Sequence, residues 1–92
     1  TPLIAAASKG YTEVVRLLLE KGANANFNGP SERAPLYEAV LGKHVDDAII
    51  LLKFGADPNS RDSERRTPLH IAASGGLTKV VDELLVNGAN VD

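Results

Sequence analysis

Hydrophobic residues recur along the chain in short groups that follow two different helical patterns. Segments 3–7 and 69–73 are apolar or small on nearly every side, which is typical of a helix packed between neighbours. Segment 14–19 instead places Val and Leu at helical spacing beside charged residues, as in an amphipathic helix with one side in water. The turn-prone residues between such groups, 56–66 for example, suit an extended loop or a short hairpin. The pattern therefore predicts units made of an inner helix, an outer helix and a loop.

These units repeat with a period of 33 residues and without insertions. The period is carried by Pro2, Pro35 and Pro68, by Gly22, Gly55 and Gly88, and by Ala6, Ala39 and Ala72. Residues 1–26 and 67–92 are identical at 15 of 26 positions, whereas 34–59 matches 67–92 at only 8, so the middle unit is the divergent one. We expect the inner helices to start near the prolines, after a Thr cap in the first and last units, and the outer helices to end near the glycines.

The last unit carries the most recognisable segments of the repeat. It reads Thr-Pro-Leu-His-Ile-Ala-Ala at 67–73, then Gly76, then paired Val and Leu residues, then Gly-Ala-Asn-Val-Asp at 88–92. In this order and at this period the unit resembles an ankyrin repeat, and the resemblance covers the whole chain. It implies an all-α solenoid of stacked helix pairs with β-hairpin or loop fingers and a concave groove. We expect one domain over 1–92, with units at 1–28 (lacking its leading finger), 29–61 and 62–92.

Several residues depart from the family pattern. Ile4 and Tyr37 stand where the family favours His, which only the last unit keeps, as His70. In the middle unit Asp47 replaces an apolar residue and Lys43 replaces a turn glycine, so we expect this unit to pack less well.

The fingers are the least regular part of the repeat. The family usually places Gly in the finger turn, but Glu32 and Arg65 occupy those positions, and Asn-Gly-Pro at 28–30 reorganises the first finger. Asn59, eight residues after Leu51, is similar to ankyrin sites modified by the intracellular asparaginyl hydroxylase. A finger-stabilising Asn is the interpretation that we favour.

Composition and charge exclude several classes of function. Twelve acidic residues against ten Lys and Arg give a net charge of -2, so the chain lacks the broad positive field that nucleic-acid binding needs. Without cysteine there is no disulfide, no thiolate nucleophile and no cysteine-bound metal. The apolar run 49–52 is far shorter than the roughly 18 residues of a membrane-spanning helix and matches the stacking face of a solenoid. We expect no specific nucleic acid and no membrane among the partners.

Candidate catalytic groups all have simpler structural interpretations. The resemblance implies that His70 hydrogen-bonds to nearby backbone at the start of its helix, and His44 is interpreted as a solvated turn residue. No Lys-Ser or Lys-Thr follows the Ser-Gly-Gly of 74–76, so this is no phosphate loop. The acidic pair 46–47 complements a helix dipole. We therefore expect neither an enzyme nor a bound cofactor or metal.

The resemblance places binding on the finger tips and on the exposed ends of the inner helices. Transferred to this chain, it selects Arg33, Arg66, Ser8, Lys9, Pro30, Ser31, Glu38, Leu41, Ser63, Glu64, Ser74 and Gly75. The implied function is a protein–protein interaction module within a larger intracellular polypeptide. The alternative is a structural spacer or an intramolecular regulatory array. We also expect flanking repeats, because the chain begins inside a unit at Thr1 and stops at Asp92 before another finger.

Two arginines suggest the chemistry of the partner. Arg33 and Arg66 lie one period apart, directly before consecutive inner helices, so stacked repeats should present them as neighbours. A basic strip of this kind, extended by Lys9, Lys43 and Arg65, favours an acidic or phosphorylated segment. The alternative is a solvated row of charges balanced by Glu32, Glu38 and Glu64.

Overall fold

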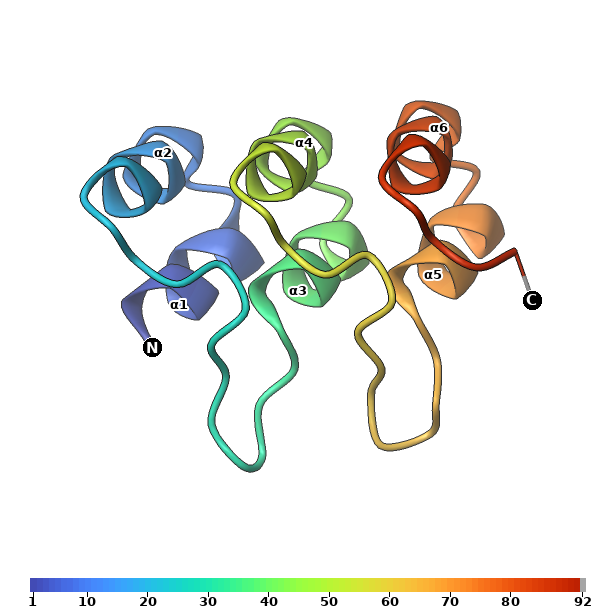
Figure 1. Cartoon of the computed structure of the whole chain (residues 1–92), viewed down its shortest axis with the longest axis horizontal. Coiled ribbons are helices and arrows are strands. Elements are labelled where there is room, and N and C mark those ends of the chain that lie inside the picture. Colours follow the sequence, from blue (N-terminus) through green and yellow to red (C-terminus); the bar gives the residue numbers. More distant parts are fainter. Residues whose placement is uncertain (92) are drawn as a thin grey trace.

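Six short helices form two layers in the computed structural model, which describes residues 1–91. The helices are α1 (Pro2–Lys9), α2 (Thr12–Glu20), α3 (Pro35–Leu41), α4 (Val45–Lys53), α5 (Pro68–Ser74) and α6 (Thr78–Val86). Helices α1, α3 and α5 stack side by side as the inner layer, and α2, α4 and α6 form the outer layer (Figure 1). The molecule measures 33 × 27 × 21 Å. Each inner helix starts at the expected proline, and each outer helix ends two residues before the expected glycine.

The loops between successive helix pairs project away from both layers on the side of the inner helices (Figure 1). No strand occurs within 1–91, so the fingers are loops rather than β-hairpins. We call residues 28–33 finger 1 and residues 61–66 finger 2. The all-α solenoid is confirmed. In the described part of the chain, no helix has the length and hydropathy of a transmembrane span.

Threonine side chains cap the first and last inner helices as expected. The Thr1 hydroxyl accepts a hydrogen bond from the Ile4 N–H at 3.1 Å. Thr67 accepts one from the His70 N–H at 3.4 Å, while His70 Nδ1 accepts from the Thr67 N–H at 3.1 Å. The two bonds form a reciprocal cap, which satisfies backbone donors that the helix itself leaves unpaired. The structural role of His70 is confirmed.

The middle helix pair is the best covered part of the molecule. Leu36, Tyr37, Val40 and Leu51 are all fully buried, because α3 and α4 have a helix pair on both sides. The expectation that this unit packs less well is wrong for the unit as a whole. Unfavourable substitutions in this unit are confined to single positions, above all Asp47, a buried carboxylate.

His44 also departs from its sequence interpretation. Its ring is half-buried rather than solvated and lies against Gly10 and Gly42, with Nε2 3.2 Å from the Ser8 carbonyl oxygen. A Cβ atom at Gly10 would come within 2.5 Å of the ring. His44 therefore helps to join the first helix pair to the second.

Asparagine side chains tie each loop to the next. Asn59 donates from Nδ2 to the Gly88 carbonyl at 3.2 Å and accepts through Oδ1 from the Asn90 N–H at 2.8 Å. Asn26 makes the equivalent pair of bonds one period earlier. Both polar ends of the Asn59 carboxamide are thus used between repeats, which supports its finger-stabilising role.

Candidate functional site

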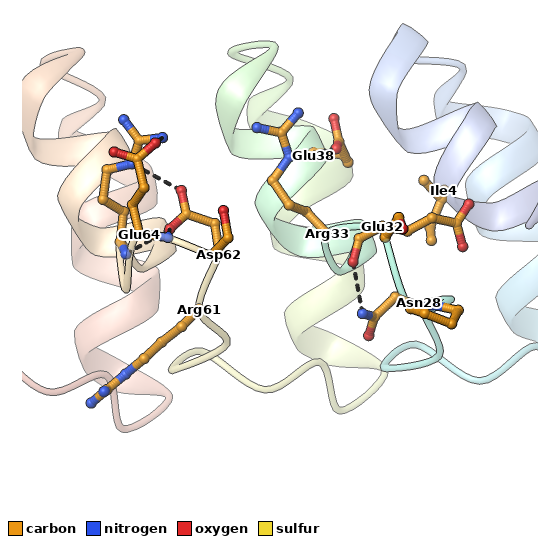
Figure 2. A pocket seen from close by; sticks show the side chains of 12 residues that line it. Ile4, Asn28, Glu32, Arg33, Glu38, Arg61, Asp62 and Glu64 are labelled. Carbon is orange, nitrogen blue, oxygen red and sulfur yellow. Dashed lines mark hydrogen bonds and ion pairs between the residues drawn. The ribbon is translucent and has the colours of Figure 1, made fainter.

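A hollow of about 690 Å³ lies between finger 1 and finger 2. We call it the interfinger groove. Twelve residues line it: Ile4, Asn28, Pro30, Ser31, Glu32, Arg33, Glu38, Arg61, Asp62, Ser63, Glu64 and Arg66 (Figure 2). Its size is within the range of pockets that hold small ligands or a few residues of chain.

The structure brings together only part of the residue set selected from the sequence. Pro30, Ser31, Arg33, Glu38, Ser63, Glu64 and Arg66 line the interfinger groove. The others lie at the carboxyl ends of the inner helices, are exposed and do not line it: Ser8, Lys9, Leu41, Ser74 and Gly75. The groove is therefore built from fingers and from the amino-terminal halves of α1 and α3.

Asp62 organises finger 2. Its Oδ1 accepts hydrogen bonds from the N–H groups of Glu64 and Arg66, both at 2.8 Å, as the first residue of an Asx turn does. Its Oδ2 accepts from the Tyr37 hydroxyl at 2.7 Å and from Arg66 Nε at 2.8 Å. Burial opposes ionisation of Asp62, but the hydrogen bonds outweigh it and hold the pKa of the carboxyl well below its usual range.

Arg33 is held on the opposite side of the groove. Its Nε donates to Glu38 Oε2 at 2.9 Å, and its guanidinium carbon lies 5.4 Å from the centre of the Tyr37 ring. Tyr37 therefore connects the two arginines. Its ring packs against Arg33, and its hydroxyl donates to the Asp62 carboxylate that accepts from Arg66. Burial, with Asp62 as a second cause, raises the pKa of the Tyr37 hydroxyl.

Finger 1 is closed by its own polar groups. Glu32 accepts from the Gly29 N–H at 2.7 Å and from the Thr1 ammonium at 3.2 Å. The Gly29 hydrogen bond is the largest cause that lowers the pKa of the Glu32 carboxyl. Asn28 donates to the Glu32 carbonyl at 2.8 Å, a contact visible in Figure 2. Glu32 is thus engaged within finger 1 and with the first residue of the chain.

The two carboxylates that hold Arg33 and Arg66 are less exposed than the arginines themselves. The lining contains three arginines and four carboxylates, so its formal charge is −1. The side chains of Asp62 and Glu38 are only 3% and 16% exposed, whereas those of Arg66 and Arg33 are 48% and 41% exposed. A molecule entering the groove therefore meets guanidinium groups that rest on buried carboxylates, together with the exposed carboxylates of Glu32 and Glu64, which are 39% and 72% exposed.

The basic strip expected from the sequence is shorter than proposed. Lys9 and Lys43 do not line the groove, and Arg65 lines a separate hollow on the α5 side of finger 2, beside Thr67 and His70. Arg61, although it contributes to the lining, points away from Arg33 (Figure 2). The cations that face Glu38 and Asp62 directly are Arg33 and Arg66.

Sequence reasoning missed the two residues that connect the site. Tyr37 and Asp62 were absent from the predicted set, although each carried a signal. Asp62 opens an Asp-Ser-Glu segment typical of an Asx turn, and Tyr37 replaces the family's His at an inner-helix position. Residues 1–91 hold no cluster of three or more His, Asp or Glu side chains arranged to bind a metal.

Comparison with known proteins agrees with the geometry. The family model described as ankyrin repeats (3 copies) matches residues 1–62, and the model described as ankyrin repeat matches residues 64–92. The crystal structure of the human ASB11 ankyrin repeat domain superposes over 100% of this chain and 42% of that one, with a TM-score of 0.91 and 35% sequence identity.

A curated relative shares the sequence as well. The potassium channel AKT2/3 of Arabidopsis thaliana is 36% identical over 92 residues, which are all of this chain. The chain spans only 11% of the length of that channel. The period, the helix pairs, the fingers and these matches together establish that the chain belongs to the ankyrin repeat family.

Proposed function

We propose that the interfinger groove binds an acidic segment of a protein partner. Ankyrin repeats are in general protein–protein interaction modules, and the fold of this chain belongs to that class. We propose in addition where the partner binds and which chemical groups it carries. The partner binds in the groove between the fingers rather than at the carboxyl ends of the inner helices, and it carries carboxylate or phosphate groups.

One observation carries this choice. Arg33 and Arg66 are partly exposed cations of the groove, and each is fixed through Nε by a carboxylate that is mostly buried. Because each guanidinium is already held in place, its side chain loses less conformational entropy when a partner binds. This arrangement also leaves the terminal nitrogens of Arg33, and one of the two of Arg66, to form charge-assisted hydrogen bonds with an incoming anion.

The test compares two double charge reversals of equal net charge. Arg33→Glu with Arg66→Glu should weaken binding of acidic 12-residue peptides by more than about tenfold and reverse the preference toward basic peptides. Lys53→Glu with Lys79→Glu, on the exposed part of the outer helices, serves as the control. Fluorescence anisotropy against acidic, neutral and basic peptides measures both, and circular dichroism verifies folding. An equal loss in the two variants, or no preference for acidic peptides, would overturn the proposal.

A second candidate function follows from the relative. The channel is much longer than this chain. In a parent protein of comparable length, the acidic segment would belong to the same polypeptide. The groove would then serve a regulatory or structural array rather than a separate partner. Cross-linking of the full-length parent protein with mass spectrometry separates the two. Links from finger 2 to another segment of the same polypeptide support the array, and links to a different protein support the interaction module.

A further inference from the structure

We infer that the bound segment adopts a polyproline II conformation and carries two acidic side chains three residues apart, one for each of Arg33 and Arg66. This inference rests on the proposed function, since it specifies the partner of the same groove. It goes beyond that function because it predicts the backbone conformation and the spacing of the recognised side chains.

The repeat sets the spacing of the two backbone positions from which the arginines extend, whereas the side chains make different contacts, Arg33 with Glu38 and Arg66 with Asp62. Arg33 and Arg66 occupy equivalent positions, and the helices that follow them, α3 and α5, pack against each other. Packed helices lie about 8 to 10 Å apart. A polyproline II chain advances about 3.1 Å per residue with three residues per turn, so side chains three apart share a face at about 9.3 Å. On a β-strand, side chains of one face lie about 6.7 or 13.4 Å apart, which fits less well.

The lining of the groove disfavours a helical occupant. Amphipathic helices dock through an apolar face, with anchors three, four and seven residues apart. Of the twelve residues that line the interfinger groove, two are apolar, Ile4 and Pro30. The others are polar or charged, and the hydroxyls of Ser31 and Ser63 are among them. A polyproline II backbone makes no internal hydrogen bonds, so its carbonyls remain available to such donors.

The two arginines differ in how many of their terminal nitrogens already have an ion-pair partner. Arg33 uses Nε for Glu38, and among residues 1–91 its terminal nitrogens have no ion-pair partner. Arg66 uses Nε for Asp62, and one terminal nitrogen lies 3.3 Å from the exposed carboxylate of Glu64. Glu64 therefore stands where an incoming acidic side chain would bind Arg66. The inference predicts that Glu64 competes with the partner, and that its removal strengthens binding.

Labelled peptides of one length and net charge test the spacing. Two glutamates are separated by one, two or three prolines in a proline-rich host, and a fourth peptide has a Glu-Gly-Gly-Glu core. The Glu-Pro-Pro-Glu peptide should bind at least about fivefold tighter than the others, because both carboxylates are then held in register. Lysine replacing both glutamates provides the charge control.

Three variants test the contacts with the same peptides. Arg33→Lys with Arg66→Lys keeps the charge and should weaken the Glu-Pro-Pro-Glu peptide at least about fivefold, because Lys cannot form the bidentate contact. Glu64→Gln should tighten it about two- to fivefold. Lys79→Gln, which removes one cation from the outer layer, is the control and should change little. Circular dichroism verifies that each variant is folded.

The outcomes distinguish failure of the polyproline II inference from failure of the proposed function. Equal binding of all four glutamate peptides, still dependent on Arg33 and Arg66, overturns the polyproline II inference and leaves the acidic partner in place. Binding that is equally strong for the lysine peptide, or indifferent to both arginines, overturns the proposed function itself. A Glu64→Gln variant that binds the Glu-Pro-Pro-Glu peptide more weakly than the original chain also contradicts the inference.

Discussion

Asp47 is a buried carboxylate in the interface between α2 and α4. Val occupies the equivalent positions of the other two units, Val14 and Val80. Asp47 Oδ1 accepts a hydrogen bond from the Thr12 hydroxyl, while Oδ2 is buried and has no hydrogen-bond partner among residues 1–91. An unpaired polar atom in such a place costs about 1 to 3 kcal/mol. The divergent middle unit carries this cost at one position without losing its packing.

Replacing Asp47 with the residue of the neighbouring units should stabilise the chain. Asp47→Val removes the unpaired oxygen and adds apolar contact, so we expect the free energy of unfolding to rise by about 1 to 3 kcal/mol. The Thr12 hydroxyl keeps an acceptor, because the Gly10 carbonyl lies 3.4 Å away. Urea denaturation measures the change. Asp46→Val, at the exposed neighbour, should change stability by less than about 0.5 kcal/mol. A destabilised Asp47→Val protein would contradict this account.

Lys43 occupies a backbone conformation that the other units give to glycine. Its φ is 62°, and the equivalent Gly10 and Gly76 have φ of 74° and 69°. A residue with a Cβ loses about 1 to 2 kcal/mol of stability in the left-handed region. Glycine avoids this strain, but its greater conformational freedom in the unfolded state offsets part of the gain. Lys43→Gly should therefore stabilise the protein by about 0.5 to 1 kcal/mol in thermal unfolding. Lys43→Ala removes the charge without relieving the strain, so an equal gain there would refute the explanation.

Finger 2 is a loop that depends on one carboxylate. Asp62 binds two backbone N–H groups of its own turn, the Arg66 side chain and the Tyr37 hydroxyl of α3. The loop also contains Arg65 in the left-handed conformation, with φ of 67°. Two backbone hydrogen bonds, from the Asp62 N–H to the Arg66 carbonyl and from the Arg65 N–H to the Asp62 carbonyl, also close the loop. The carboxylate adds the side-chain contacts that hold this turn against α3. Protonation of Asp62 should therefore loosen finger 2.

The pH dependence follows from the lowered pKa of Asp62 in the folded chain. A carboxyl with a depressed pKa contributes stability above its unfolded pKa, about 4, and loses that contribution as the pH falls toward the folded value. Asp62→Asn should be less stable than the original chain at pH 7, and the difference should shrink below pH 4. Denaturation at pH 7, 4 and 2.5 measures it. Two parallel stability curves across this range would rule out Asp62 as the titrating group.

The elements differ in how far the sequence predicts them. The 33-residue period, the proline starts and the closing glycines place all six helices, because these signals are local and each is repeated. The contact between Tyr37 and Asp62 is harder to predict, because the two residues are 25 apart in the sequence. The turn that contains Asp62 also has Arg65 in the left-handed conformation, which no local signal indicates.

The ion pairs of the groove are local by contrast, since Arg33–Glu38 and Arg66–Asp62 join residues five and four apart. The sequence predicted Arg33 and Arg66 as neighbours and named Glu38 and Glu64 among the carboxylates that balance them, and both pairs form. It did not predict Asp62, the most buried carboxylate of the groove pairs.

The two end faces of the solenoid expose side chains whose equivalents elsewhere are buried. On the face of α2, Val14 is 46% exposed, whereas its equivalent Val80 is 0% exposed against the preceding helix pair. On the face of α6, Leu85 is 41% exposed, whereas its equivalent Leu52 is 4% exposed. Both faces therefore have the chemistry of an interface between repeats. We propose that further ankyrin repeats cover them in the parent protein.

Attaching a native or consensus helix pair to the α2 face should stabilise the whole array. In a solenoid, stability is approximately the sum of the terms for single repeats and for the interfaces between them, so one new interface raises the thermal midpoint of all units. We expect a rise of at least about 5 °C, which corresponds to roughly 1 kcal/mol in a domain of this size. Differential scanning calorimetry measures it.

A substitution at the new interface distinguishes stacking from simple attachment. Leu17 is 54% exposed on the α2 face, and its equivalent in the middle unit, Ile50, is buried against the preceding helix pair. Leu17→Gln should therefore cost less than about 0.5 kcal/mol in the chain as it stands, but about 1 to 2 kcal/mol once the extra helix pair covers it. The difference between the two costs is the coupling between residue and added repeat. If the extended array is no more stable, or if Leu17→Gln costs the same in both backgrounds, the exposed α2 face does not stack on a further repeat.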